Sequence, residues 1–340
     1  VTSCRISCPA LTRPDAPPGL FTGKEDGDNP IPVTSLGVDK RAALVTDTCT
    51  PPTASARGFH LGLAMWANED WRGGLYPPHG SQGERLPDYA RVFSAVEGNT
   101  TFYSGTPRAA TVAAWARQAP ADFRFCFKLP GALTHERRLT GVEGDLDDFL
   151  EALSPLHDRL GPVMIQLPRD FGLGELPKLE ALLERWPAGI PASVEVRDPE
   201  FFHKGSAEAA LNRLLITHGV DRVMLDVRPL FATPAGNDAR LAKAQSEKPK
   251  RPLHVISTAH QPVVRFIGHF DAAINEARFM PWVDRLCLWI KQGKTPFLFV
   301  HTPDNRQAPA LARACHERLA ARLALTSLAP FPGERQTSLL

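Results

Sequence analysis

The sequence predicts an α/β protein with a TIM-like (β/α)8 parallel barrel whose strands need not all be regular. Eight short apolar runs rich in Val, Ile, Phe and Leu alternate with segments of helical spacing, and polar residues gather where the runs end. A chain of 340 residues has room for such a barrel of ~250 residues. An open doubly wound sheet is the rival, but no GxGxxG motif follows the first run.

The eight runs define the expected strands, because β-branched and aromatic residues between turn signals are typical of buried strands. They span residues 60–66, 93–103, 123–130, 163–168, 192–198, 222–229, 262–269 and 297–304.

The segments between the runs define the expected helices, because their apolar residues recur at helical spacing. They span residues 108–118, 145–161, 175–186, 207–219, 280–293 and 308–325. Gly161 and Gly219 stand where a glycine commonly follows a helix. Two long connections, 67–92 and 230–261, interrupt this alternation, and the second, with its charged SEKPKRP stretch, is interpreted as an exposed insertion.

The two ends of the chain differ from the barrel domain expected at 58–325. Residues 1–57 hold eight prolines, three cysteines and no tryptophan or tyrosine, so we expect a Pro-rich extension of low order. Residues 326–340 are expected to form a C-terminal tail. The six cysteines have no zinc-ligand spacing, which favours free thiols.

The charge balance restricts the classes of partner. A net charge of +2, from 39 basic and 37 acidic residues, gives no general attraction for nucleic acid or anionic membrane. Nucleic acid therefore stays open as a partner, but the net charge does not support it. No apolar run approaches the ~20 residues of a membrane span, and no secretion signal opens the chain, so we expect a soluble cytoplasmic protein.

Polar residues at the ends of the runs predict the functional site. Both faces of a strand in a parallel barrel are buried, and the carboxyl ends of the strands build the active site. Seven runs end in such residues: Glu97 and Asn99, Lys128, Gln166, Glu195 and Arg197, Asp226 and Arg228, Arg265 and His269, and His301 followed by Asp304 and Asn305.

Strand parity refines this prediction. Residues two apart share a face, so Glu195 and Arg197 should point into the barrel mouth while the valines beside them point to the helices. Asp226 and Arg228 repeat the pattern, with Leu225 and Val227 expected on the helix side. Each pair could also be a bridge that serves stability alone.

The residue types favour recognition of an anion combined with proton transfer. Arginine and lysine suit phosphate or carboxylate, and the carboxylates and histidines could act as acids or bases. Two alternatives stay open. The residues Glu97, Glu195, Asp226, His269 and His301 could bind a divalent metal, although no HExxH motif is present. Two carboxylates across the mouth could also serve a glycosidase.

Two further features could belong to the mouth. Trp66, Trp71, Tyr76 and Tyr103 could form a platform for a sugar or base, or pack the rim. His135 follows the third run in LTHERRL, beyond Lys128, and could be a solvent-exposed loop residue or part of the site.

The chain resembles the YecE-like family, domain of unknown function 72. The resemblance is carried by LYP (75–77), LPDYARVFSAVEGNTTFY (86–103), FRFCFKLPGALTHERRL (123–139), LGPVMIQLP (160–168), VEVRDPEFF (194–202) and FVHTPDN (299–305), and covers roughly residues 60–325. It implies a TIM-like barrel but no activity. In overall plan the barrel is similar to metal-dependent sugar isomerases and endonuclease IV, an analogy that does not fix function.

The resemblance also implies which positions lie on recurring motifs: Glu97, Asn99, Thr101, Tyr103, Lys128, Thr134, His135, Gln166, Glu195 and Arg197. Gly98 departs from the family pattern, because an apolar residue is expected there. HTPDN, in place of an asparagine-rich ending, indicates the YecE-like branch.

These observations predict an enzyme or ligand-binding protein for an anionic small molecule, such as a phosphorylated or acidic sugar, with a hydrolase or isomerase as the enzyme classes. The expected catalytic residues are Glu97, Glu195, His135, Asp226 and His301, with Glu97 and Glu195 as the proton-transfer pair. The expected substrate-binding residues are Asn99, Tyr103, Lys128, Gln166, Arg197, Arg265 and Asn305. A metal-dependent phosphodiesterase or nucleic-acid-processing protein and a non-catalytic binding protein are the alternatives, and no cofactor is assigned.

Overall fold

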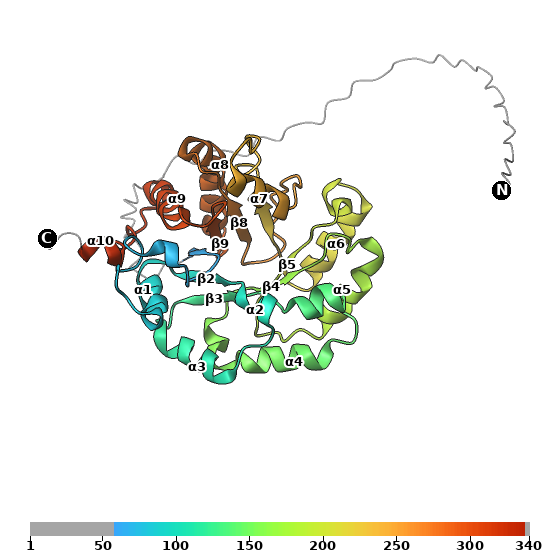
Figure 1. Cartoon of the computed structure of the whole chain (residues 1–340). Coiled ribbons are helices and arrows are strands. Elements are labelled where there is room, and N and C mark those ends of the chain that lie inside the picture. Colours follow the sequence, from blue (N-terminus) through green and yellow to red (C-terminus); the bar gives the residue numbers. More distant parts are fainter. Residues whose placement is uncertain (1–57, 337–340) are drawn as a thin grey trace, which may run out of the picture. The chain divides into compact units, whose positions relative to one another are not determined.

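A computed structural model describes residues 58–336 of the chain as an α/β fold with parallel strand pairing. The expected extension at 1–57 lies outside these residues. Within them the strands form a six-stranded sheet of order β3-β2-β1-β9-β8-β7 and a three-stranded sheet of order β4-β5-β6 (Figure 1). The strands are β1 His60–Leu63, β2 Ala95–Gly98, β3 Arg124–Phe127, β4 Val163–Gln166, β5 Ala192–Glu195, β6 Asp221–Arg222, β7 Met224–Asp226, β8 Val263–Ile267 and β9 Phe297–His301.

Each of the eight predicted runs contains a strand, and the sixth run is divided between the two sheets. Val223 separates β6, which pairs with β5, from β7, which pairs with β8. On the other side, single bridges join Phe125 to Leu160 and Lys128 to Met164, so β3 is linked to the chain around β4. The two sheets are therefore connected at both of these places.

One side of the sheets, called the inner side below, brings side chains from both sheets together. Its small apolar cluster comprises Ala95, Cys126, Met164, Val223, Val263, Phe297 and Phe299. The opposite side packs against helices, as the rings of Phe266 and Phe279 do at 5.4 Å. Because residues two apart share a face, the residue after next on each strand extends this inner cluster toward the carboxyl ends.

Helices follow most strands and cover the outer side (Figure 1). They are α1 Arg85–Val92, α2 Thr100–Ser104, α3 Ala109–Gln118, α4 Glu143–Ala152, α5 Leu176–Glu184, α6 Ser206–Thr217, α7 Ala239–Glu247, α8 Ala272–Lys291, α9 Ala308–Leu323 and α10 Pro332–Gln336. The six predicted helices are all present, whereas α1, α2, α7 and α10 were not predicted.

Two predicted helix ends differ from the structure. The helix expected to run to Gly161 ends at Ala152, because Pro155 lacks the N–H donor that would continue it. Pro155 instead lies in the first turn of a separate 3-10 helix, Ser154–Arg159. The helix expected from 280 begins eight residues earlier, where the carboxylate of Asp271 accepts hydrogen bonds from the first-turn amides of Ala273 and Ile274. Gly219 does follow α6, with φ of +64°.

The second run, expected to be a strand over 93–103, is a strand only over Ala95–Gly98. The polar stretch after it turns into α2. There Asn99 donates to the carbonyl of Ala64 at 2.8 Å and Thr101 donates to the carbonyl of Lys128 at 2.6 Å. The hydrogen-bonding side chains thus tie the end of β2 to its two neighbouring strands. Gly98 is required because a Cβ there would lie 2.4 Å from the ring of Phe127.

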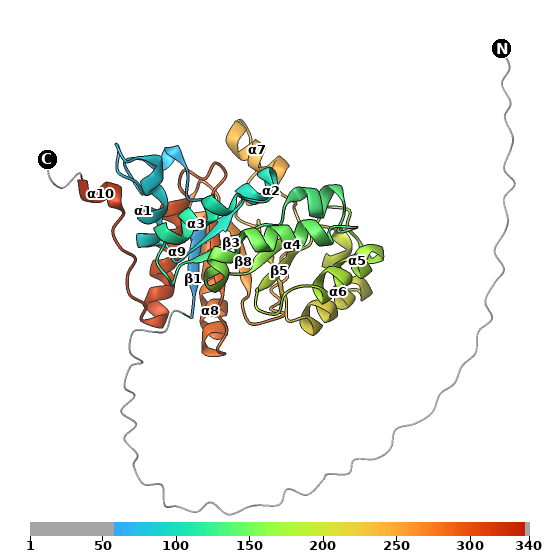
Figure 2. The same ribbon diagram turned by 90° about the horizontal axis from the view of Figure 1, so that it is seen from below.

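The second long connection, 230–261, is more than an exposed insertion, because it contains α7. Leu241 and Ala244 of α7 are buried in a cluster with Val227, Leu230 and Ile267, which stand at or after the ends of β7 and β8. Figure 2 shows α7 and α2 on the same side of the molecule. The strands that precede them, β7 and β2, end on this side. The α7 segment is therefore docked on the carboxyl ends of the strands.

Part of the predicted C-terminal tail packs against the rest of the described chain. Within the expected C-terminal tail, Phe331 is buried and the guanidinium of Arg313 stacks on its ring at 3.4 Å.

No helix within residues 58–336 combines the length and the apolar composition that a membrane span requires.

Candidate functional site

Arg265 of β8 joins two buried carboxylates on the inner side. Its guanidinium holds Glu97 through two hydrogen bonds, Nε to Oε2 at 2.7 Å and Nη2 to Oε1 at 2.8 Å, and reaches Oε2 of Glu195 through Nη1 at 2.6 Å. All three side chains are almost fully buried. Buried carboxylates are stable only when paired, and one arginine here serves two of them.

Lys128, Gln166 and Arg197 form the second half of the cluster. The Oε1 atom of Gln166 accepts from the ammonium of Lys128 at 3.1 Å and from Nη2 of Arg197 at 2.8 Å. Lys128 also lies 3.3 Å from Oε1 of Glu97, and Arg197 pairs with Oε1 of Glu195 at 2.7 Å. Of the residues in both halves, Arg197 alone is partly exposed, with 15% of its side chain open to solvent.

His301 completes what we call the site cluster: Glu97, Lys128, Gln166, Glu195, Arg197, Arg265 and His301. Its Nε2 lies 3.3 Å from Oε2 of Glu97. The strand register accounts for this gathering, because Gln166 pairs with Glu195 and Glu97 with Cys126 of the inner cluster. The sequence therefore predicted seven residues that the fold brings into one network.

The two carboxylates are held as anions. Burial by itself would raise their pKa values, but Arg265 holds the pKa of Glu97 well below its usual range, with Lys128 adding to the effect. For Glu195, burial is likewise outweighed by Arg265 and then Arg197, and its pKa is strongly lowered. Both residues are thus ionised at neutral pH and stay so under mild acid.

The pKa values of Lys128 and His301 are also lowered, which for these two basic groups favours the neutral form. Burial, followed by the nearby charge of Arg265, lowers the pKa of Lys128 to about 8. Burial also lowers the pKa of His301 to about 4, although Glu97 opposes that shift. At neutral pH, His301 is therefore neutral and donates Nε2–H to Glu97, and Lys128 is charged but close to its titration range.

His135 stands at the rim of the site cluster. It belongs to a π turn, Ala132–Glu136, and its Nδ1 lies 2.8 Å from the hydroxyl of Thr134. The side chain is half-buried, and burial and then the charge of Arg197 lower its pKa. The charges of Arg197, Glu195 and Lys128 all act on this pKa, and the ring packs edge-on against Phe102 with centres 5.0 Å apart.

Asp226 and Arg228 do not join the site cluster, and the predicted parity of their strand is wrong. The carboxylate of Asp226 accepts from Nε1 of Trp282 in α8 at 2.8 Å and from Arg228 at 2.7 Å. Its register partner is Phe266, which also faces α8, whereas Leu225 pairs with Arg265. Asp226 therefore points to the helix side, and Leu225 occupies the inner side.

The five residues of the metal hypothesis are likewise divided. Nε2 of His269 lies 3.0 Å from the hydroxyl of Thr233, and its Nδ1 accepts from the backbone amide of Asp271, so His269 and Asp226 are engaged away from Glu97. Within residues 58–336, no group of three or more His, Cys, Asp or Glu side chains is arranged to hold a metal ion.

The remaining predicted binding residues lie at the rim or serve the loops. Asn99 is occupied by the carbonyl of Ala64. Asn305 adopts φ of +60°, and its side chain accepts from the amide of Thr302. Tyr103 on α2 is 85% exposed. Of the other aromatic residues, Trp71 and Tyr76 are buried, which agrees with rim packing.

Sequence reasoning missed Lys248. This half-buried residue follows α7, and its pKa is lowered by burial and then by Arg265, while Glu97 and Glu195 oppose the shift. Its ammonium is thus within electrostatic reach of the site cluster. A long connection after a strand's carboxyl end is where functional residues concentrate, and that position was the available signal.

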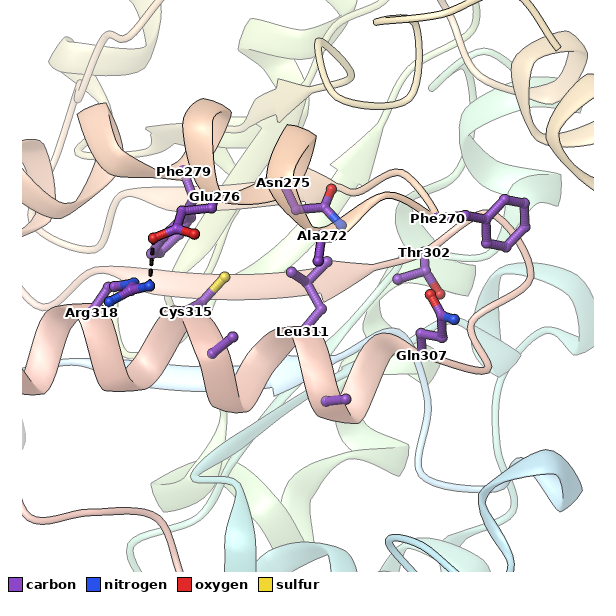
Figure 3. A pocket seen from close by; sticks show the side chains of 12 residues that line it. Phe270, Ala272, Asn275, Glu276, Phe279, Thr302, Gln307, Leu311, Cys315 and Arg318 are labelled. Carbon is purple, nitrogen blue, oxygen red and sulfur yellow. Dashed lines mark ion pairs between the residues drawn. The ribbon is translucent and has the colours of Figure 1, made fainter.

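An apolar hollow of about 410 Å³ lies elsewhere, between α8 and α9 (Figure 3). Phe279, Leu311 and Cys315 line it, and an ion pair between Glu276 and Arg318 crosses one end. No residue of the site cluster lines it. The charged side chains Glu276 and Arg318 at the hollow are paired with each other, and the rest of its named lining is apolar.

The family model described as "Protein of unknown function DUF72" matches residues 60–336. The protein named UPF0759 protein YecE is similar in two Escherichia coli strains, at 41% and 40% identity over 283 residues. Each alignment covers 83% of this chain and 99% of the relative.

Solved structures of DUF72 family proteins have a similar fold. The structure from Enterococcus faecalis gives a TM-score of 0.59 at 18% identity, covering 80% of this chain and 98% of that one. The structure from Thermotoga maritima gives 0.56 at 20% identity, covering 77% and 98%. At these identities the likeness concerns the fold alone.

Proposed function

This chain belongs to the DUF72 family of proteins of unknown function, and we propose that it binds an anionic small molecule bearing phosphate or carboxylate at the site cluster and acts on it by acid-base chemistry. The observation that carries the proposal is an excess of positive charge in a buried place. Lys128, Arg197 and Arg265 face only two carboxylates, Glu97 and Glu195.

Uncompensated buried charge is costly, so a fold keeps it where a ligand supplies the missing counter-charge. Arg197 offers the approach, because it is the partly exposed cation and carries the planar donor pattern that matches phosphate or carboxylate. Gln166 fixes this guanidinium from one side at 2.8 Å, and Glu195 from the other, so its direction is set before a ligand arrives.

The proposed architecture is a closed (β/α)8 barrel with this cluster in its mouth. Three features support closure: the shared inner cluster, the bridges from β3 to the chain around β4, and the strand pair β6 and β7 that spans both sheets. In such a barrel the carboxyl ends of the strands form the site, which is where Glu97, Glu195 and His301 stand.

Lys128 is the group best matched to proton transfer. A general acid or base works best when its pKa lies near the working pH, and the pKa of Lys128 is about 8. Glu97 and Glu195, expected to transfer protons, instead serve in this proposal as fixed anions that hold Arg265 and Lys128 in place. His135 is the second candidate.

The test compares two arginines that stand two residues after a carboxylate. Thermal unfolding is followed with inorganic phosphate, glucose 6-phosphate and glucuronate for the wild type, Arg197→Gln and Arg228→Gln. We expect at least one anion to raise the Tm of the wild type and of Arg228→Gln, whose arginine pairs outside the site cluster, but not of Arg197→Gln.

The proposal fails if none of these anions stabilises the wild type, or if Arg197→Gln responds as the wild type does. The unliganded Tm of each variant shows whether it is folded. Turnover of a stabilising ligand then separates an enzyme from a binding protein.

A further inference from the structure

We propose that Lys248, from the connection after α7, is a fourth cationic residue of the ligand site, and that it selects a dianionic phosphate monoester over a monoanion such as a carboxylate. This inference rests on the proposed function and adds the ligand class. It concerns a residue outside the short motifs that carry the family resemblance.

The chain on both sides of Lys248 is fastened over the ends of β4 and β5. Nη2 of Arg169, three residues after β4, donates to the carbonyl of Glu247 at 3.1 Å. Nε of Arg251 donates to the carbonyl of Arg197 at 2.8 Å. The docking of α7 against β7 and β8 holds the segment from a third direction. Lys248 is thereby placed above the strand ends that carry Gln166, Glu195 and Arg197.

The ammonium of Lys248 forms neither a hydrogen bond nor a direct ion pair with the described side chains, although the chain on both sides of it is fastened over the strand ends. Arg265, Glu97, Glu195 and Arg197 all act on its charge. The neighbouring Lys250 differs, because it is exposed and its ammonium lies 5.3 Å from the ring centre of Phe231. A half-buried cation in this position is arranged to meet a ligand.

The balance of charge indicates the ligand. Four cations, Lys128, Arg197, Arg265 and Lys248, face two anions, Glu97 and Glu195, while His301 is neutral at pH 7, so the group carries an excess of two positive charges. A monocarboxylate neutralises one of them. A phosphate monoester carries about −1.5 to −2 at pH 7 and neutralises nearly both. It also offers three oxygens, so Lys128, Arg197 and Lys248 can each meet one.

Two isosteric probes test this inference: methyl phosphate, a dianion at pH 7.5, and methyl sulfate, a monoanion of the same shape. Acetate serves as the carboxylate. Affinities are measured by calorimetry at low salt for the wild type, Lys248→Met and Lys250→Met. The two variants lose the same overall charge, so Lys250→Met controls for general electrostatics.

We expect the wild type to bind methyl phosphate at least about tenfold more tightly than methyl sulfate or acetate, as one further charge-assisted contact allows. Lys248→Met should lose most of that preference, with weaker binding of methyl phosphate and little change for methyl sulfate. Lys250→Met should keep the wild-type preference.

The outcomes separate the two proposals. If methyl sulfate or acetate binds the wild type as tightly as methyl phosphate, or if Lys248→Met retains the preference, Lys248 does not select the ligand, although the anion site stands. If none of the three probes binds the folded wild type, the proposed function itself is overturned for small anions, and this inference with it.

Discussion

Two clusters of buried charge in this chain use the same residue types and differ in their balance. The α6 cluster comprises Glu208, Asn212, Arg222 and His254. In it, Nη1 of Arg222 donates to Glu208 and Asn212, both at 2.9 Å, and Nη2 donates to the carbonyl of Phe201 at 2.8 Å. One carboxylate meets one guanidinium. His254 and the backbone amide of Lys204 form the remaining hydrogen bonds to the carboxylate of Glu208.

The site cluster has no such balance, because its cations outnumber its carboxylates and one of them, Arg197, faces solvent. Charge balance distinguishes a structural ion pair from a binding site. A balanced, fully bonded pair stabilises the packing of the elements that carry it. In the proposed function, the excess positive charge of the site cluster is instead met by an anionic ligand.

The largest effect is expected in the α6 cluster. Arg222→Met leaves Glu208 buried with only the hydrogen bonds to His254 and the amide of Lys204, and breaking a buried pair costs about 3–5 kcal/mol of unfolding free energy. Urea unfolding measures the loss. Phosphate affinity of the folded fraction should stay at the wild-type value, and a loss of binding without a loss of stability would reverse the assignment of the two clusters.

His301 should make stability depend on pH. Its pKa of about 4 in the folded state lies below the ordinary 6.5, so the unfolded chain takes up the proton first and stability is lost as pH falls from 6.5 toward 4. The full loss is roughly 3–4 kcal/mol at 1.36 kcal/mol per pKa unit. His301→Gln keeps a donor for Glu97 but has no proton to gain, so its unfolding free energy should fall less over this range.

The difference in unfolding free energy between the wild type and His301→Gln at each pH isolates the contribution of His301. Asp221, whose pKa burial raises to about 6, titrates in both and contributes stability that is lost as pH rises instead. Parallel pH profiles for wild type and His301→Gln would show that His301 is not the neutral partner of Glu97.

Lys128→Met should separate binding from stability. A lysine whose pKa is lowered to about 8 destabilises the folded state when charged, so its removal is expected to leave unfolding free energy unchanged or raise it by roughly 1–2 kcal/mol. Anion binding should weaken by at least about tenfold. Urea unfolding and calorimetry give the two values, with Lys178→Met as a surface control. A marked loss of stability would make Lys128 a structural partner of Glu97.

Ser193 should show the smallest effect. Its hydroxyl is fully buried beneath Glu195 on the same strand and has no hydrogen-bond partner among the described residues. Removing an unsatisfied buried hydroxyl is expected to raise stability by up to about 1 kcal/mol, so Ser193→Ala should unfold at a slightly higher urea concentration with anion affinity unchanged. Lower stability in this variant would indicate that the hydroxyl is satisfied in solution.

Local patterns along the chain located the strands and all seven residues of the site cluster. Alternation along 192–198 placed Glu195 and Arg197 together, and polar residues at the ends of apolar runs marked Glu97, Lys128, Gln166, Arg265 and His301. These signals are local, because a strand repeats every two residues and buried polar side chains are rare enough to be informative.

Other features depend on long-range packing. Both faces of these strands are buried, so alternation could not say that Leu225 lies on the inner side and Asp226 against Trp282; only the register with β8 fixes it. The chain beside Lys248 is held over the ends of β4 and β5 through Arg169 and Arg251, by hydrogen bonds between residues 78 and 54 positions apart, and no local pattern records such contacts. Periodicity gives each residue a face, but the partner of that face is set by long-range packing.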